Sequence, residues 1–341
     1  MLVEPDLDQT ALAAALEREY GLAASAVRFL PAGETAWCYQ VTDERGGRWF
    51  LKLGRPGAIE PARAEFALEL GRALADLGLP VPRPQPIRAG ALWCWLGELR
   101  LALFEFINGE PLSDHDLSAA GLTERVAGLA AGVHAATGAL GMPVPFVETF
   151  AVWAEGLRRC LAELQGAGGA DELVAEAQTL VWPQRMALLG MLERVQALGD
   201  VARSKPREQV LCHGDLIGDN LLGDRAGRVW AVDWDGAALA PRERDLALFA
   251  GQGFERFVDG YQHAAGNRGV DLDADLVAFF LLRRNLDDLI DWLGAVLHDD
   301  RPVEQRRADL DGVRWCLSRW AALEARIQHT RRVLPRQRRF R

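Results

Sequence analysis

Three side chains suited to metal binding and acid–base chemistry follow one another in a short part of the chain. The stretch "VLCHGDLIGDNLL" (210–222) places Asp215 and Asn220 between two apolar runs, and Asp233 follows in "AVDWD". Burying unpaired polar groups between apolar runs is costly, which indicates that these side chains have a task. Mg²⁺ takes carboxylate and amide oxygens together with phosphate oxygens, which suits Asn220 and Asp233. Asp215 is then left to accept a proton from an attacking hydroxyl, or to orient it.

The segments around these residues predict how they are presented. Short strands and loops are expected between about 208 and 235, with Asp215 after one strand, Asn220 on the next and Asp233 at the end of the third. The rest of the C-terminal part is apolar at helical spacing, which predicts helices over about 115–137, 149–165, 171–203, 243–263, 272–298 and 303–330.

The N-terminal part has a different pattern. Alternating runs predict strands at 27–30, 37–41, 49–53, 91–96 and 99–106, with helices over 8–20 and 60–77. Gly46-Gly47 between two of these runs predicts a hairpin. We therefore predict an α+β fold with a small β-rich lobe at 1–106, a hinge at about 103–112, and a larger, mostly helical lobe at 107–341.

Lysine is rare in this chain and occurs only at Lys52 and Lys205, because the other basic residues are arginine. Lys52 lies inside the apolar run "WFLKL". A lysine there either extends its charge to solvent from a strand edge or supplies a compact positive charge to a tight site. Its rarity favours the second interpretation.

Composition limits the class of protein and its partners. The 341-residue chain is 49% hydrophobic and 26% charged, with no run long enough for a membrane span and a start, "MLVEPDLDQT", unlike a signal peptide. The net charge of −9 disfavours nucleic acid and suits a cationic small molecule, although the tail "RRVLPRQRRFR" is basic. Five scattered cysteines without a C-x-x-C pair favour a reducing cytoplasm. Monomer and homodimer both stay open.

The set H-G-D-x-x-x-x-N followed by "VDWD" resembles the aminoglycoside phosphotransferase and choline kinase superfamily, distant relatives of protein kinases. Further similar segments follow in the family's order across the whole chain: "RFLPAGETAWCYQV" (28–41), "FLKL", "ARAEFALEL", "LFEFINGEPL" (103–112) and "LAAGVHAAT" (129–137). Agreement of several elements in order is more specific than any single motif. The resemblance implies a bilobal protein-kinase-like fold.

The resemblance also implies residue roles. Asp215 corresponds to the catalytic residue, and Asn220 and Asp233 to the ligands of Mg²⁺. The cofactor is ATP, with GTP as the alternative nucleotide. Its binding residues correspond to Gly33 in the phosphate loop, Lys52, its ion-pair partner Glu65 (Glu69 is the alternative), and the hinge residues Glu105, Phe106 and Ile107.

Within the superfamily, "MLVEPDLDQTALAAALEREYGL" and "DWDGAALAPRERDL" look most like the spectinomycin phosphotransferase branch. This likeness implies transfer of the γ-phosphoryl group of ATP to a hydroxyl of an aminocyclitol antibiotic, with resistance as the result. A kinase of choline, a sugar or an amino alcohol is the alternative, and a nucleotide-binding pseudokinase scaffold is a third. Asp287, Asp288 and Asp291 in "NLDDLIDW" either receive substrate amines or form a solvated acidic face.

Other residues of the polar stretch have structural interpretations. His213 is expected to hydrogen-bond the backbone and fix the loop, and His134 to be a core histidine. Asp219 stands where relatives commonly have glycine, with Gly218 one place earlier, which predicts a shifted turn. Asp235 is either a second carboxylate near the metal or a turn residue.

Overall fold

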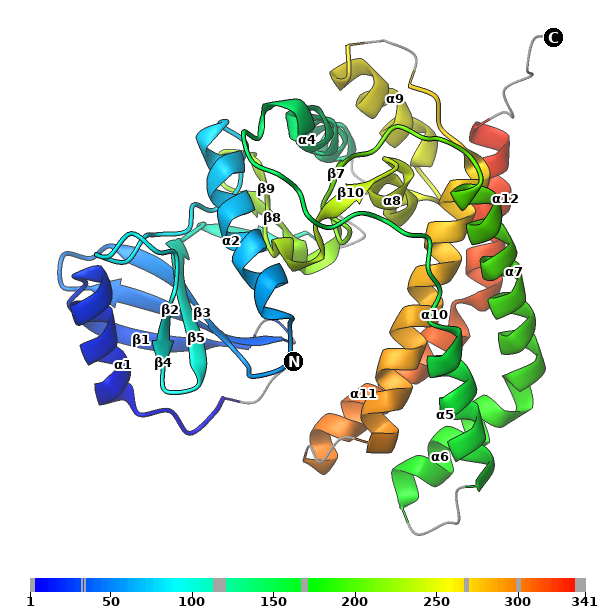
Figure 1. Ribbon diagram of the computed structural model, residues 1–341, viewed down its shortest axis with the longest axis horizontal. Coiled ribbons are helices and arrows are strands. Elements are labelled where there is room, and N and C mark those ends of the chain that lie inside the picture. The colour runs from blue at the N-terminus through cyan, green and yellow to red at the C-terminus, as the bar shows by residue number, and fades with distance from the viewer. Residues whose placement is uncertain are drawn as a thin grey trace. The chain divides into compact units, whose positions relative to one another are not determined.

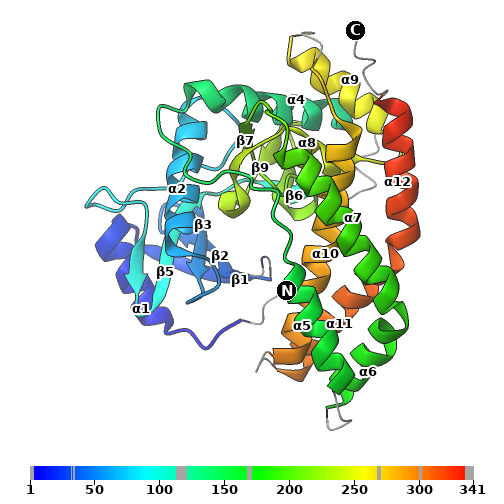
Figure 2. The same cartoon turned by 45° about the vertical axis from the view of Figure 1, so that its right-hand side comes forward.

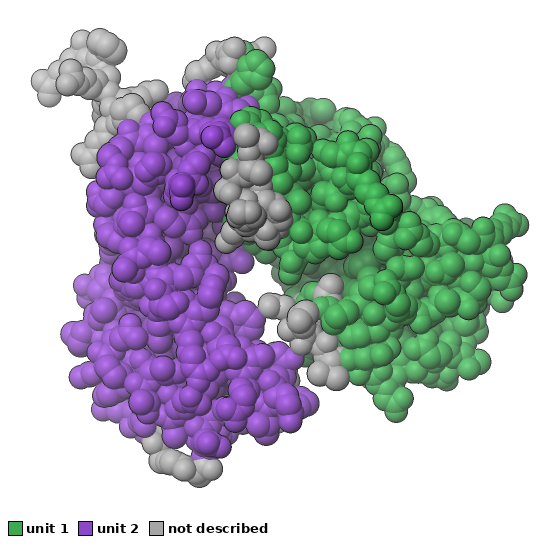
Figure 3. All heavy atoms as spheres, turned by 180° about the vertical axis from the view of Figure 1, so that it is seen from behind, with its two compact units in different colours: residues 1–146, 211–238, 263–266 green, residues 147–210, 239–262, 267–341 purple. Residues whose placement is uncertain are grey.

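A computed structural model describes residues 4–31, 33, 35–112, 121–166, 171–266, 270–298 and 302–334 (Figure 1). The chain forms two compact units, each made from separate stretches of sequence (Figure 3). Unit 1 comprises residues 1–146, 211–238 and 263–266, and unit 2 comprises residues 147–210, 239–262 and 267–341. Unit 1 thus contains the predicted boundary at 106/107 and also the whole segment with Asp215, Asn220 and Asp233.

A five-stranded antiparallel sheet forms the N-terminal part of unit 1, in the order β1-β2-β3-β5-β4. Its strands are β1 (Ala24–Leu30), β2 (Ala36–Asp43), β3 (Arg48–Gly54), β4 (Cys94–Leu96) and β5 (Leu99–Glu105). The turn between β2 and β3 has Gly46 at φ +82°, a conformation that residues with a Cβ rarely adopt. The predicted strands and hairpin are confirmed.

The two faces of this sheet have different partners. Leu51, Leu53 and Tyr39 pack with Leu12 and Leu16, which belong to α1 (Gln9–Ala15) and the π-helical turn after it. On the other face, Ala102 of β5 packs with Leu68 of α2 (Pro61–Asp76). Successive side chains of a strand point to opposite faces, and Lys52 pairs in register with Ala102. Lys52 therefore projects from the face that α2 covers.

The remainder of unit 1 is built around a second, three-stranded sheet in the order β6-β8-β9. Its strands are β6 (Gly109–Pro111), β8 (Leu221–Asp224) and β9 (Val229–Ala231), and the helix α4 (Leu122–Ala135) contacts β9. Residues 115–120 of the predicted helix 115–137 lie outside the described residues. The strand β6 lies in the predicted hinge, where Gly-Glu-Pro gives no strand signal, and its pairing with β8 provides the backbone hydrogen bonds.

Unit 2 is mostly helical. The chain passes from unit 2 to unit 1 within β7 (Val210–Cys212) and returns to unit 2 within β10 (Ala238–Ala240). Its helices are α5 (Ala154–Gly166), α6 (Glu172–Val181), α7 (Arg185–Arg203), α8 (Glu243–Leu246), α9 (Phe254–Ala264), α10 (Ala274–His298), α11 (Val303–Ser318) and α12 (Trp320–Val333). The helix α10 contacts α5, α6, α7, α8, α11 and α12 (Figure 2). Buried apolar residues cover most of its circumference. It is the core of the unit.

Three predicted helices are each divided in the structure. Pro183 lies in a 3₁₀ turn between α6 and α7, because proline lacks the amide that a continuous helix needs. Gly251 and Gly253, at φ +132° and +87°, separate α9 from α8. The third break, at Arg319, lies between α11 and α12. In the described part of the chain no helix meets the length and apolarity that crossing a membrane requires. Residues 335–341 of the basic tail lie outside that part.

Candidate active site

Lys52 is the centre of a three-residue charge cluster within unit 1. Its Nζ lies 2.8 Å from Oδ1 of Asp233 and 2.8 Å from Oδ2 of Asp235. Burial alone would lower the pKa of Lys52, but the two carboxylates outweigh it and hold that pKa above its usual value. The lysine therefore keeps a full positive charge.

Asp233 occupies an unusual backbone position two residues after the end of β9. Its φ of +65° and ψ of +74° lie in the left-handed region, which few residues other than glycine adopt. Such conformations persist where surrounding contacts determine them, and they concentrate at functional sites. Burial raises the pKa of Asp233, but the positive charge of Lys52 outweighs this effect and lowers the pKa to about 2. The carboxylate is therefore ionised.

Glu65 does not have the partner that the family resemblance implies. Among the ion pairs of the described residues, Oε1 of Glu65 lies 3.9 Å from Nη2 of Arg100 on β5. More than half of the Glu65 side chain is exposed. Lys52 pairs with Asp233 and Asp235 instead. The expected Lys52–Glu65 ion pair is therefore wrong for this structure, because two nearer carboxylates and a competing arginine take both partners.

His213 holds the loop that follows β7. Its Nδ1 accepts a hydrogen bond from the backbone N–H of Asp215 at 3.2 Å, so Nε2 carries the proton and donates it to the carbonyl oxygen of Val232 at 2.9 Å. The ring is fully buried and packs 4.5 Å from the ring of Trp234. His213 thus connects the Asp215 loop to the strand that precedes Asp233, as predicted.

Asn220 binds Asp215 directly. Its Nδ2 donates to the backbone oxygen of Asp215 at 3.0 Å and to Oδ2 at 2.9 Å, which directs its carbonyl oxygen Oδ1 elsewhere. The backbone oxygen of Asn220 accepts a hydrogen bond from the N–H of Val232 at 3.0 Å, which continues the pairing of β8 with β9 by one residue. Asn220 therefore lies beside the residue that precedes Asp233. Together Asn220 and Asp233 offer an amide oxygen and an ionised carboxylate. This all-oxygen donor set fits Mg²⁺.

The turn before Asn220 has its left-handed position at Gly218, at φ +58°. Residues 218–220 form a 3₁₀ turn, and Asp219 in its middle is exposed and has no positive φ. Glycine one place earlier therefore supplies the conformational freedom that the turn needs. Asp219 needs no special backbone conformation.

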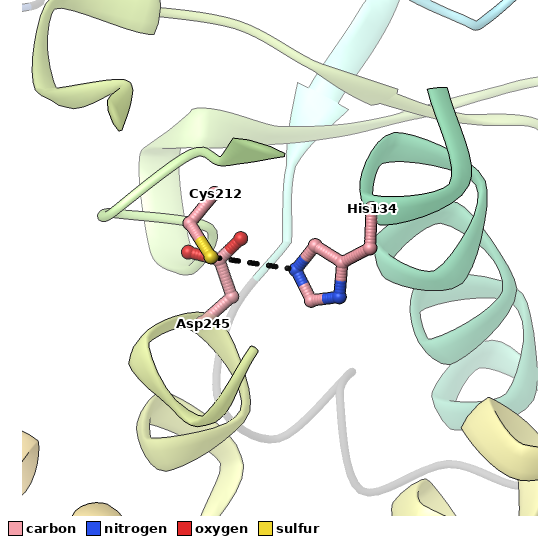
Figure 4. Close-up of side chains that lie close together, drawn as sticks. All are labelled: His134, Cys212 and Asp245. Atoms are coloured by element: carbon pink, nitrogen blue, oxygen red, sulfur yellow. Dashed lines mark hydrogen bonds between the residues drawn. The ribbon is translucent and has the colours of Figure 1, made fainter. Parts of the chain in front are cut away.

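The strand β7 is tied to α4 and to the 3₁₀ turn Ala136–Ala139 that follows it. Nε2 of His134 lies 3.8 Å from Sγ of Cys212 (Figure 4), and Oγ1 of Thr137 accepts from the N–H of Leu211 at 2.8 Å. His134 is 4% exposed, which confirms that it is a core histidine.

Removing the His213 ring is expected to destabilise the protein. His213→Ala leaves the N–H of Asp215 and the oxygen of Val232 without their partner, at a cost of about 1–3 kcal/mol. Equilibrium urea unfolding measures this loss. The exposed His263 of α9 provides the control, since its replacement by alanine should change the free energy of unfolding by less than about 0.5 kcal/mol. Equal stability of the two variants would contradict the bracing role.

The other predicted nucleotide residues occupy the sheet and the segment after it. Gly33 is exposed at φ +82° between β1 and β2. Glu105 is exposed at the end of β5, Ile107 is half-buried, and the ring of Phe106 lies 4.8 Å beneath the guanidinium of Arg48. Their roles stay predictions.

The predicted acidic residues lie on α10 in unit 2. Asp287 and Asp291 line a cavity of about 500 Å³ together with Ala151, Val152, Trp153 and Arg283. Asp288 is instead engaged by Nε of Arg284, at 2.8 and 3.1 Å. Burial raises the pKa of Asp287 to about 6, with Arg283 opposing and Asp291 adding to the increase. Burial raises the pKa of Asp291 too.

Sequence reasoning missed two side chains of this cavity. Trp153, directly before α5, is 49% exposed. Arg283 lies at the cavity with both guanidinium nitrogens on the buried carboxylate of Glu148, at 2.7 and 2.9 Å. The only available signal was the polar content of "LLRRNLDDLIDW" within an apolar helix.

A lysine on a sheet strand, two aspartates paired with it and an adjoining Asp–Asn pair are the residue types that a kinase-like phosphotransferase site requires. The chain belongs to the phosphotransferase enzyme family, whose sequence profile matches residues 26–279. It is accordingly a phosphotransferase. No curated protein sequence matches the chain.

Solved structures share the fold over nearly the whole chain. Spectinomycin phosphotransferase in complex with ADP and spectinomycin has a TM-score of 0.77 at 19% identity, covering 94% of this chain and 100% of that one. An amicoumacin kinase with AMP-PNP and Ca²⁺ has a TM-score of 0.63 at 14% identity, covering 92% and 94%. The choline kinase LicA from Streptococcus pneumoniae has a TM-score of 0.60 at 15% identity, covering 92% and 99%. At these identities the likeness establishes the fold.

Proposed function

We propose that the protein transfers the γ-phosphoryl group of ATP to a hydroxyl of a cationic aminocyclitol antibiotic of the spectinomycin type, and so confers resistance. The observation that carries this proposal is the joined cluster of Lys52, Asp233, Asn220 and Asp215 in unit 1. Family membership supports the reaction class, and the structural likeness to a spectinomycin phosphotransferase supports the acceptor.

The residues of the cluster have distinct roles in the proposed transfer. Asp215 accepts the proton of the acceptor hydroxyl while the acceptor oxygen bonds to the γ-phosphorus. The bond between that phosphorus and the β–γ bridging oxygen breaks, and ADP leaves. Lys52 places a fixed positive charge on the phosphates, and its charge is maintained by Asp233 and Asp235. Asn220 restrains the Asp215 carboxylate through its amide, so that the base is oriented before the acceptor binds.

The remaining nucleotide contacts follow the family resemblance. Asn220 and Asp233 hold Mg²⁺, which neutralises charge on the phosphate oxygens when it is bound. Gly33 approaches the phosphates, and the segment Glu105–Ile107 contacts the adenine of ATP, with GTP as the alternative nucleotide. Glu65 contributes to nucleotide binding only if it leaves its ion pair with Arg100 and forms one with Lys52. The cytoplasmic location, the absence of nucleic-acid and membrane partners, and the monomeric or homodimeric state stay predictions.

The cavity on α10 supports a cationic acceptor. Asp287 and Asp291 are one helical turn apart and present two carboxylates to the same space as the half-exposed ring of Trp153. Carboxylates pair with ammonium groups, and the face of an indole attracts them as well. Asp288 is left out of this role because Nε of Arg284 binds it at 2.8 Å, whereas Nε of Arg283 lies farther from the carboxylate of Asp287, at 3.8 Å.

Acceptor binding is expected to weaken as the pH falls through about 6. Only the ionised carboxylate attracts a cationic acceptor, and the pKa of Asp287 is about 6, so kcat/KM for the acceptor decreases below that pH. Asp287→Asn should raise the acceptor KM about tenfold and remove this pH dependence, since a charge-assisted hydrogen bond is lost. Steady-state kinetics between pH 5 and 8 measure both effects. Asp288→Asn should keep the wild-type profile, and an unchanged profile in Asp287→Asn would exclude the role.

A choline or amino-alcohol kinase is the second candidate, and the exposed Trp153 beside two carboxylates favours it. A quaternary ammonium group binds well against an indole face. The fold is shared with a choline kinase.

A coupled assay that detects ADP release distinguishes the two candidates. Purified protein is supplied with ATP, Mg²⁺ and either spectinomycin, other aminocyclitols, aminoglycosides or choline. We expect the highest kcat/KM for spectinomycin, and expression in a sensitive host to raise its resistance. Preference for choline would transfer the assignment to the second candidate, and no turnover with any acceptor would favour a pseudokinase scaffold.

A further inference from the structure

Arg63 lies in the first turn of α2, a position that is electrostatically unfavourable for a cation. The N-terminus of a helix carries a partial positive charge, and this helix has no acidic residue in its first turn. The placement of an arginine there is therefore explained by contacts outside the helix.

Those contacts are made to the turn that carries the site carboxylates. Nη1 of Arg63 donates to the backbone oxygens of Asp235 and Ala237, at 3.2 and 3.4 Å. Both oxygens lie at the end of the 3₁₀ turn Trp234–Gly236, where carbonyl groups lack partners within the turn. A cation at that end is favourable, so Arg63 caps the turn from another element.

Aromatic rings fix the orientation of this guanidinium. Arg63 lies 4.0 Å above the ring of Phe146, which contacts the ring of Phe66 edge to face at 5.4 Å. Phe66 is on the same helix as Arg63, one turn further along. The planar group is thus held against a ring while its edge faces the turn, which a lysine could not reproduce.

The turn that Arg63 caps is also in contact with Lys52 on the sheet and with the loop that presents Asp215. Its side chains Asp233 and Asp235 bind Lys52 on the sheet. Gly236 packs so closely on the backbone oxygen of His213 that a Cβ would lie 3.2 Å from it. A shift of the turn would therefore displace both the carboxylates and the loop that presents Asp215.

We propose that Arg63 is a positioning residue for phosphoryl transfer, which holds residues 233–237 in the geometry that presents the Asp233 carboxylate. The inference rests on the proposed function, because it assumes that Asp233 acts on the metal–nucleotide complex. Displacements of about 1 Å in such sites can lower a rate about 100-fold.

The test compares Arg63→Ala and Arg63→Lys with Arg72→Ala, which removes an exposed arginine of the same helix paired with Glu69. Arg63→Ala should lower kcat about 10- to 100-fold and raise the Mg²⁺ concentration for half-maximal activity. Calorimetry should show weaker ADP binding with Mg²⁺ but unchanged ADP binding without it. Arg63→Lys should be intermediate, Arg72→Ala should match the wild type, and millimolar ethylguanidinium should restore part of the activity of Arg63→Ala.

Two results would overturn the inference. One is a wild-type Mg²⁺ dependence in Arg63→Ala, and the other is a loss of unfolding free energy with no change in Mg²⁺-dependent ADP binding. If Arg63→Ala does not fold, Arg63→Lys and Phe146→Leu carry the same test. The first weakens the hydrogen bonds to the turn, and the second removes the ring that orients the guanidinium. Asp233→Asn separates the two proposals. Full activity of Asp233→Asn refutes the proposed function. Loss of activity in Asp233→Asn, together with wild-type activity of Arg63→Ala, refutes only this inference.

Discussion

Asp215→Ala is expected to lower kcat by about 10³-fold while the affinity for ADP changes less than twofold. The carboxylate accepts the acceptor proton in the proposed transfer, and nothing else in the described part of the site is placed to replace it. The side chain of Asp215 binds Asn220, and its backbone binds both Asn220 and His213, so the loop keeps its two backbone contacts after the substitution. Stopped-flow or coupled kinetics and calorimetric titration with ADP give the two quantities.

The control for this prediction lies four residues away. Asp219 is an exposed carboxylate of the same loop, and Asp219→Ala should keep kcat within about twofold, as surface substitutions usually do. Asp215→Asn keeps the shape and the contact to Asn220 but cannot accept a proton, so it should be nearly as inactive as the alanine variant. Near-normal kcat in either Asp215 variant would refute the catalytic assignment.

The sheet of unit 1 was predictable because its signals are local. Alternation of apolar and polar residues defines β2 and β3, and the glycine pair between them permits the turn. The same alternation places Lys52 on one face and its neighbours Leu51 and Leu53 on the other. The breaks inside the long helical patterns were harder to place, since a 3₁₀ turn at Pro183 keeps nearly the same apolar spacing as a helix.

The partner of Lys52 was not predictable from local pattern. Asp233 is 181 positions away along the chain, and only the tertiary fold determines whether it or Glu65 lies closer. Asp215, Asn220 and Asp233 could be grouped from the sequence because they share one short stretch. Arg63 and Trp153 gave no such signal, because their contacts come from segments distant in the sequence.

Asp233→Asn is expected to lower kcat/KM for ATP by about 10³-fold, comparable to the loss of a main electrostatic group in an active site. The substitution keeps the size of the side chain but removes its charge. Lys52 holds the pKa of Asp233 at about 2, so the wild-type residue is fully ionised at neutral pH. A neutral amide oxygen is a weaker ligand for a hard cation, so the Mg²⁺ requirement should rise as well. Initial rates over a series of Mg²⁺ concentrations measure it.

Asp235→Asn is the matched comparison, because Asp235 binds the same Nζ at the same distance of 2.8 Å. If Asp235 only supports Lys52, its substitution leaves the Asp233–Lys52 pair intact and the Mg²⁺ requirement unchanged, with a smaller loss of rate. If Asp235 is a second carboxylate near the metal, the two variants should share the same shift in Mg²⁺ requirement. A wild-type Mg²⁺ dependence in Asp233→Asn would remove Asp233 from the metal site, and the carboxylate would then serve only to orient Lys52.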